Sequence, residues 1–201
     1  MTSMIAFHVV TERPMSVGQR IAFDETNRSG VWRRVQEQAD EVARIYADAE
    51  QAPPALDHLL AVAFRELAME EVRLVRFPQH PSRLSSLYVS ETLADAESWC
   101  ALFISWGRPT YQIVRLEITG RRFSGDARNC FTGTADRTEN LRLAEQYWAG
   151  HDSEQAGEPI VETLVDGEID VVEIVRTVNA NLPDPVPAAE EPGIGRSDCD
   201  D

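Results

Sequence analysis

Three side chains that could take part in chemistry lie in segments with the sequence pattern of β-strands. His8 is the one polar residue in the apolar run MIAFHVV, and Glu162 lies in the run IVETLV. Tyr88 stands between Ser86 and Ser90, so its strand neighbours leave its ring uncovered. Each also has a structural interpretation: a buried imidazole satisfied by hydrogen bonds, an aromatic core residue and an outward-facing strand carboxylate.

The segment around this tyrosine predicts a strand, a tight turn and a helix. Leu87 and Val89 alternate with polar or small neighbours, which is the period-two pattern of a half-buried strand. Thr92 precedes Asp95 by three residues, as in an N-cap pair at the start of a helix. Apolar residues then recur at helical spacing until Gly107.

Strand and helix patterns alternate along the rest of the chain. The longest predicted helix covers 55–76, and we expect its charged residues, Glu66 and Arg73 among them, to face solvent. Residues 121–137 are Gly- and Asp-rich and predict a long loop. Further helices are predicted within 36–51 and 138–149, and strands at 4–10, 20–23, 109–120 and twice within 159–178, where a turn at Asp166-Gly167 joins the two.

The composition indicates one acidic globular domain. The 201 residues carry a net charge of −15, which argues against general binding to nucleic acid. All 19 basic residues are arginine, so a catalytic lysine is excluded. We expect a single domain at 1–180, followed by a disordered Pro-rich, acidic tail at 181–201.

Several common classes of site and location are not indicated. The chain has no Rossmann or P-loop glycine pattern, no HExxH and no GxSxG. Cys100, Cys130 and Cys199 lack metal-ligand spacing and predict free thiols in a reducing compartment. There is no signal-peptide pattern and no apolar run near the roughly 20 residues of a membrane span. We therefore expect a cytoplasmic protein without a bound metal.

Three segments, taken together, resemble the ADP-ribosyltransferase-like superfamily. FHVVTERPMSVGQRI is similar to the opening strand of the rifampin-modifying transferases, and SLYVSETLADAESWC to the tyrosine strand and helix of the poly-ADP-ribose polymerases. VETLVDGEIDVVEIV resembles the late strand that carries the catalytic glutamate. The match is to the His-Tyr-Glu branch, which also includes the RNA 2′-phosphotransferases. The whole chain also looks like a member of a bacterial family of unknown function.

The resemblance implies a fold, a substrate and a set of site residues. The fold would be α+β, with a split, mostly antiparallel sheet around a cleft that holds NAD. His8, Tyr88 and Glu162 would be catalytic, and His8, Tyr88, Ser90 and Arg83 would bind NAD. Glu162 would stabilise positive charge on the ribose, Tyr88 would stack on nicotinamide, and His8 would bind a ribose hydroxyl.

Alternatives remain open for the site and for the function. Glu117 and Glu173 are also strand carboxylates and could take the role of Glu162. Pyrophosphate could be bound by arginines that could equally form surface ion pairs, namely Arg83, Arg121, Arg122 and Arg128.

The predicted function is an ADP-ribosyltransferase or NAD glycohydrolase that passes ADP-ribose to an unidentified protein, nucleic acid, small molecule or water. Val9-Val10 stand where the superfamily has Gly and then Ser or Thr, and Ser86 where the polymerases prefer Gly. The alternative is therefore an inactive NAD- or ADP-ribose-binding module. A partner-binding protein that uses Trp106, Tyr147 or Trp148 is a further possibility, although such aromatics are more often core.

Overall fold

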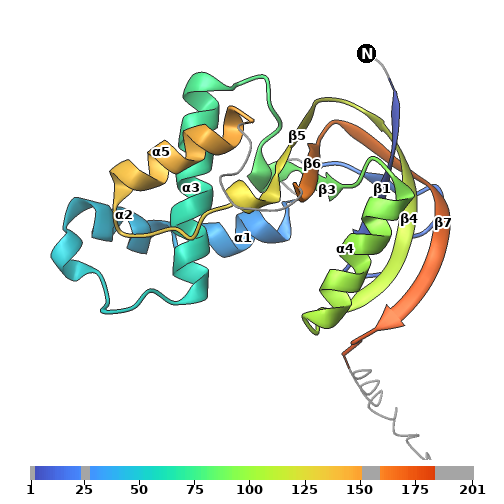
Figure 1. Ribbon diagram of the computed structural model, residues 1–201, viewed down its shortest axis with the longest axis horizontal. Helices are drawn as coiled ribbons and strands as arrows, with labels where there is room; N and C mark the ends of the chain where they lie inside the picture. The colour runs from blue at the N-terminus through green and yellow to red at the C-terminus, as the bar shows by residue number, and fades with distance from the viewer. Residues whose placement is uncertain (1–2, 24–27, 151–158, 184–201) are drawn as a thin grey trace, which may run out of the picture.

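The computed structural model describes residues 3–23, 28–150 and 159–183. They form a single α+β domain in which two antiparallel sheets lie beside a group of helices (Figure 1). The predicted linker at 151–158 and nearly all of the predicted tail lie outside the described residues. Within the described part of the chain, no helix combines the length and apolar character that crossing a membrane requires.

The larger sheet has the order β1-β4-β7-β2. Its inner face is a cluster of buried aliphatic side chains that includes Val114, Leu116 and Ile169, as period-two burial requires. The predicted strands are confirmed within a few residues, and their bounds are β1 Met4–Val10, β2 Arg20–Ile21, β4 Thr110–Thr119 and β7 Glu168–Ala180.

The smaller sheet has the order β3-β6-β5 and consists of β3 Leu87–Val89, β5 Arg122–Asp126 and β6 Val161–Val165. Two predictions are wrong here. Residues 121–137 are not all loop, because β5 pairs with β6. The strands on either side of Asp166-Gly167 also form no hairpin: β6 belongs to the smaller sheet and β7 to the larger.

The two sheets separate where the chain turns between them. Gly120 links β4 to β5 and Gly167 links β6 to β7, and the two turns touch. A Cβ on Gly120 would lie 1.9 Å from the carbonyl oxygen of Asp166, and one on Gly167 would lie 2.5 Å from that of Thr119. Gly167 also has a φ of +93°, which favours glycine. Only residues without a side chain allow this close crossing.

Helices cover both parts of the sheet. The helix α3 His58–Arg76 begins at an Asp57 N-cap and packs against α5 Arg137–Trp148. Two shorter helices, α1 Gly30–Gln36 and α2 Ala39–Ala47, also contact α3. The helix α4 Leu93–Ser105 packs on β1 and β4 and begins, as predicted, at the Thr92 N-cap. The helix α4 therefore covers the larger sheet, and the other helices form a separate group in which α3 and α5 pack on the smaller sheet (Figure 1).

The charged face predicted for α3 is wrong at two positions. Glu66 and Arg73 are only 1% and 7% exposed. Tyr147 and Trp148 of α5 are each 1% exposed, so they belong to the core, and of the three aromatics proposed for an interface only Trp106 is exposed. Trp148 donates its indole N–H to the Met69 carbonyl of α3 at 2.8 Å. This contact fixes α5 on α3.

Candidate functional site

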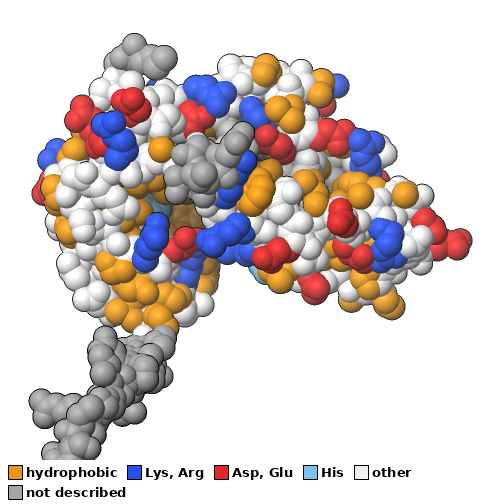
Figure 2. All heavy atoms as spheres, turned by 180° about the vertical axis from the view of Figure 1, so that it is seen from behind, with side chains coloured by type: hydrophobic (Ala, Val, Ile, Leu, Met, Phe, Trp, Pro, Cys, Tyr) orange, Lys and Arg blue, Asp and Glu red, His pale blue; other side chains and the backbone are white. Residues whose placement is uncertain are grey.

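A large cleft of about 1480 Å³ lies between the sheets and the helical group. Figure 2 shows a hollow between the two halves of the molecule, with arginine side chains near its margin. The cleft is lined by the three predicted catalytic residues, His8, Tyr88 and Glu162, and by Ser90. They come from β1, β3, β6 and the residue after β3.

His8 joins the two sheets at the cleft wall. Its Nδ1 lies 2.8 Å from the Tyr88 carbonyl oxygen. Because a carbonyl only accepts, Nδ1 carries the proton, and Nε2 is an acceptor with no hydrogen-bond partner among the described residues. Burial, followed by Arg108, lowers the pKa of His8, although the Tyr88 carbonyl and Glu12 oppose the shift. A neutral imidazole at neutral pH can therefore accept a hydrogen bond from a ligand hydroxyl.

Backbone hydrogen bonds hold the strands of His8 and Tyr88 together. The Phe7 N–H donates to the Ser90 carbonyl and the Ser90 N–H donates to the Phe7 carbonyl, each at 2.8 Å. This bridge connects β1 of the larger sheet to the end of β3. The Ser90 side chain is nearly buried, and its hydroxyl makes no hydrogen bond among the described residues. Its predicted role in binding NAD stays a prediction.

The Tyr88 ring is half-buried and lies beside a charged group. The Arg83 guanidinium carbon is 5.3 Å from the ring centroid, within the range of a cation–π interaction. Burial raises the pKa of Tyr88, and this outweighs the opposing effect of Arg83. The phenol therefore keeps its proton, and the ring is a flat surface for stacking.

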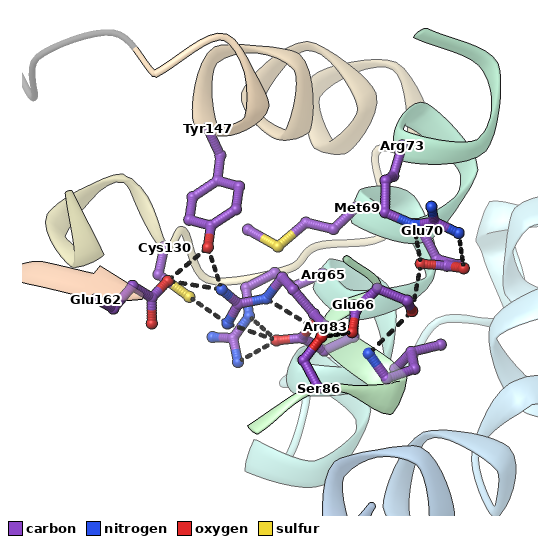
Figure 3. A network of polar contacts seen from close by, with 12 residues as sticks. Arg65, Glu66, Met69, Glu70, Arg73, Arg83, Ser86, Cys130, Tyr147 and Glu162 are labelled. Carbon is purple, nitrogen blue, oxygen red and sulfur yellow. Dashed lines mark hydrogen bonds and ion pairs between the residues drawn. The ribbon is translucent and has the colours of Figure 1, made fainter. Parts of the chain in front are cut away.

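Glu162 is anchored through one of its two carboxylate oxygens. Its Oε1 accepts from Arg83 Nη1 at 2.6 Å and from the Tyr147 hydroxyl at 2.7 Å (Figure 3). Its Oε2 makes no hydrogen bond among the described residues. The side chain is 12% exposed, and the residue lines the cleft. One oxygen therefore positions the carboxylate, and the other remains available to a ligand.

Arg83 lies behind Glu162 at the centre of a buried polar network (Figure 3). Its Nε donates to Glu66 at 2.9 Å, its Nη1 also contacts Tyr147 at 2.6 Å, and its Nη2 is 3.6 Å from the sulfur of Cys130. It is 4% exposed and is not among the residues that line the cleft. Its predicted contact with NAD stays a prediction, whereas its contact with Glu162 is direct.

Opposite charges compensate for burial in this network. Burial alone would lower the pKa of Arg83, but Glu162 and Glu66 hold that pKa well above its ordinary value. Burial alone would raise the pKa of Glu66, but Arg83 and Arg65 outweigh it and the net shift is downward. Burial raises the pKa of Tyr147 well above its ordinary value, so its hydroxyl stays protonated and donates to Glu162. The network is a set of mutually compensating charges.

Other predicted candidates lie elsewhere. Glu117 and Glu173 are exposed and do not line the cleft. The three arginines of the predicted loop do not line the cleft and form ion pairs, Arg121 with Asp166, Arg122 with Glu91 and Arg128 with Asp126. Of the three strand carboxylates considered, only Glu162 reaches the cleft.

Sequence reasoning missed the residues that support Glu162. Tyr147 was assigned to core or interface, and Glu66 to the solvated face of its helix. One signal was available: Glu66 lies on the stripe of Ala63, Met69 and other apolar residues of α3, and a charge there needs a partner. Among the described residues, no group of three or more His, Cys, Asp or Glu could hold a metal ion.

These features define an α+β protein with a split antiparallel sheet and a polar cleft at the split. A family model described as a protein of unknown function (DUF2441) matches residues 6–177. The chain therefore belongs to that family, and the match includes His8, Tyr88 and Glu162. No curated protein gives a significant match.

Proposed function

We propose that this protein cleaves the bond between nicotinamide and ribose in NAD and passes ADP-ribose to an acceptor or to water. The supporting observation is that His8, Tyr88 and Glu162, expected together from the resemblance, line one cleft in which Glu162 keeps one carboxylate oxygen unpaired. Three residues far apart in the sequence share a wall only because both sheets contribute to it.

In the proposed reaction, the C1′–N bond breaks and nicotinamide leaves with the bonding electrons. Positive charge then develops on the ribose, as in glycoside hydrolysis. Glu162 Oε2 would stabilise this charge and accept a hydrogen bond from the 2′-hydroxyl. Arg83 and Tyr147 hold Oε1, so the carboxylate does not reorganise as charge develops. His8 Nε2 would accept from a ribose hydroxyl, and Tyr88 would stack on nicotinamide.

Measuring the release of free nicotinamide from NAD tests this proposal. We expect Glu162→Gln to lower turnover by about 10²- to 10³-fold and to change NAD binding little, because only the charge is lost. Tyr88→Ala should weaken binding and turnover together, since stacking acts in both states. Glu173→Gln is the matched control, because Glu173 lies on an exposed surface. Equal turnover in wild type and Glu162→Gln would contradict the proposal.

The second candidate function is an NAD- or ADP-ribose-binding module without turnover, which Val9-Val10 favour. Both side chains, however, are committed to packing: Val10 lies in the core cluster of the larger sheet and Val9 in the cluster under α4. Both residues also belong to the lining of the cleft, although Val9 and Val10 are only 7% and 1% exposed. Calorimetry separates the candidates, because a module binds ADP-ribose and releases no nicotinamide.

A further inference from the structure

The cleft has a charge opposite to that of the chain. Among the described residues, its lining contains two glutamates, Glu12 and Glu162, and no aspartate. Against these stand seven arginines: Arg13, Arg20, Arg28, Arg33, Arg34, Arg65 and Arg108. The local excess is positive in a protein with a net charge of −15. At physiological ionic strength charges are screened beyond about 8 Å, so a ligand in the cleft responds mainly to these arginines.

Five of these arginines form no ion pair with another described residue. Arg13, Arg28, Arg33, Arg34 and Arg108 have no carboxylate oxygen within 4.0 Å among the residues that the structure describes, whereas Arg20 and Arg65 are paired. Desolvation at the cleft wall, followed by the nearby Arg34, lowers the pKa of Arg108, although Glu12 opposes the shift. Clustered guanidinium groups of this kind repel one another and are stabilised by an anion.

Aromatic side chains lie among the arginines. The cleft is lined by Phe103 and by three of the four tryptophans of the chain, Trp32, Trp99 and Trp106. Arg28 lies 4.9 Å from the centroid of Trp32, and Arg108 lies 4.7 Å from that of Phe103. Trp106 is 64% exposed. Stacking surfaces that alternate with guanidinium groups are typical of grooves that bind single-stranded nucleic acid.

The cleft is larger and more basic than NAD alone requires. Its volume of about 1480 Å³ exceeds the roughly 300–1,000 Å³ of a typical small-molecule pocket. The two phosphates of NAD would pair with about two guanidinium groups, which leaves a positive excess. We propose that the arginine and tryptophan side chains bind a single-stranded nucleic acid beside NAD, and that this strand is the ADP-ribose acceptor. Its acceptor role rests on the proposed function.

The transfer step needs only NAD, the bound strand and water. A nucleophilic oxygen or nitrogen of the strand forms a bond to ribose C1′ as the bond from C1′ to the nicotinamide nitrogen breaks. Neutral nicotinamide leaves with the bonding electrons, and the proton of the nucleophile passes to water. Phosphate contacts would position the strand, and the tryptophans would stack on its bases.

The binding part is tested by fluorescence anisotropy with labelled single-stranded DNA and RNA of about 12 nucleotides, without NAD. We expect the affinity for these oligonucleotides to fall steeply as the salt concentration rises. Arg34→Ala and Arg108→Ala should each reduce the slope of log K against log[salt] by about 0.7, the value for one phosphate contact on a single strand. Arg44→Ala removes the same charge from α2, outside the cleft, and should leave the slope unchanged.

A substitution of an aromatic residue distinguishes binding of a nucleic acid from binding of other polyanions. Trp106→Ala should weaken oligonucleotide binding by about 5- to 150-fold and leave the salt slope intact, because stacking involves no counterion. Binding of inorganic polyphosphate, which has no bases, should be unaffected by Trp106→Ala. Absence of oligonucleotide binding at low salt, or equal affinity in wild type and Trp106→Ala, would contradict the proposal.

The acceptor role is tested separately by mass spectrometry of the strand after incubation with NAD. We expect a mass increase of one ADP-ribose group per modified site. Release of nicotinamide to water with the bound strand unmodified would contradict the acceptor role. No release of nicotinamide would contradict the proposed function and with it the acceptor role, whereas the anisotropy result would stand independently.

Discussion

At the scale of single residues, the site depends on which atoms are already bound and which remain available. Glu162 uses Oε1 for Arg83 and Tyr147, and His8 uses Nδ1 for the Tyr88 carbonyl. The other oxygen and the other ring nitrogen have no hydrogen-bond partner among the described residues. Each group is therefore fixed in orientation and keeps one polar atom for a ligand, which is the arrangement that preorganised sites require.

Removing the Tyr147 hydroxyl tests whether this positioning matters. We expect Tyr147→Phe to lower kcat for nicotinamide release by about tenfold, the equivalent of one ordinary hydrogen bond, with little change in KM. Tyr46→Phe is a matched control, because Tyr46 accepts a hydrogen bond from Asn140 at 2.8 Å and does not line the cleft. If both variants lose stability equally and neither loses turnover, Tyr147 has only a structural role.

The lowered pKa of His8 predicts that the folded protein loses stability at acid pH. The pKa of His8 is lowered in the folded state, so below about pH 6.5 the unfolded chain binds a proton that the folded chain does not. The free energy of unfolding should therefore fall as the pH decreases from 6.5 toward the native pKa of His8. His80, whose pKa is also lowered by burial and by Arg73, contributes in the same direction.

The contribution of His8 is isolated by comparing Tm against pH in wild type and His8→Gln. We expect a shallower acid-side decline in the variant, because glutamine does not titrate in this range. His58→Gln is the control, since His58 is exposed. Parallel curves for wild type and His8→Gln would show that His8 titrates alike in the folded and unfolded states.

At the scale of elements, the cleft exists because the chain changes sheets twice at the same place. The β4–β5 and β6–β7 turns lie against each other at Gly120 and Gly167. Arg121 reinforces the contact, because its side chain and its backbone N–H both donate to the Asp166 carboxylate. Glu162 of the smaller sheet thereby reaches the same cleft as His8 of the larger one.

Gly167→Ala tests this crossing. The new Cβ would meet the Thr119 carbonyl oxygen at 2.5 Å while the backbone holds a positive φ, so we expect a loss of about 3 kcal/mol or more in the free energy of unfolding. Gly150→Ala is the matched control: φ is also positive there, but no atom of another described residue lies within 4 Å of the new Cβ. Its cost should be about 1 kcal/mol. If chemical denaturation showed similar losses of stability for Gly167→Ala and Gly150→Ala, the close contact between the two turns would be contradicted.

At the scale of the whole molecule, one arginine connects the helical group to the sheets. Arg83 binds Glu66 of α3, Tyr147 of α5 and Glu162 of β6. These partners lie 17, 64 and 79 residues away in the sequence. The guanidinium fork suits this role, because its donors point in fixed directions and it stays charged when buried.

Removing this connection should be costly in a way that a second substitution partly restores. We expect Arg83→Met to lower the free energy of unfolding by about 3–5 kcal/mol, because Glu162 loses its ion-pair partner and Glu66 keeps only Arg65. Adding Glu162→Gln should recover at least about 1 kcal/mol by removing the charge that is left unpaired. Arg20→Met breaks an exposed ion pair with Asp170 and should leave the free energy of unfolding nearly unchanged. Strict additivity in denaturant melts would contradict the coupling.

The sequence by itself determined most of the elements. The apolar run of β1, period-two burial in β4, the apolar stripe of α3 and the Thr92 cap of α4 are set by neighbours within a few residues, so local patterns predict them. The α+β class and the antiparallel strands follow from these patterns together with the resemblance. The candidate residues His8, Tyr88 and Glu162 could be named from the same strand patterns and the same resemblance.

Only the tertiary structure decided the surroundings of those residues. The burial of Glu66 depends on a guanidinium from elsewhere in the chain, and a charge without a known partner is expected at the surface. The crossing at Gly167 likewise depends on contact with Gly120, so Asp166-Gly167 looks like an ordinary hairpin turn when read locally. The basic cleft lies in an acidic chain because folding gathers arginines from several segments, and net charge does not record position.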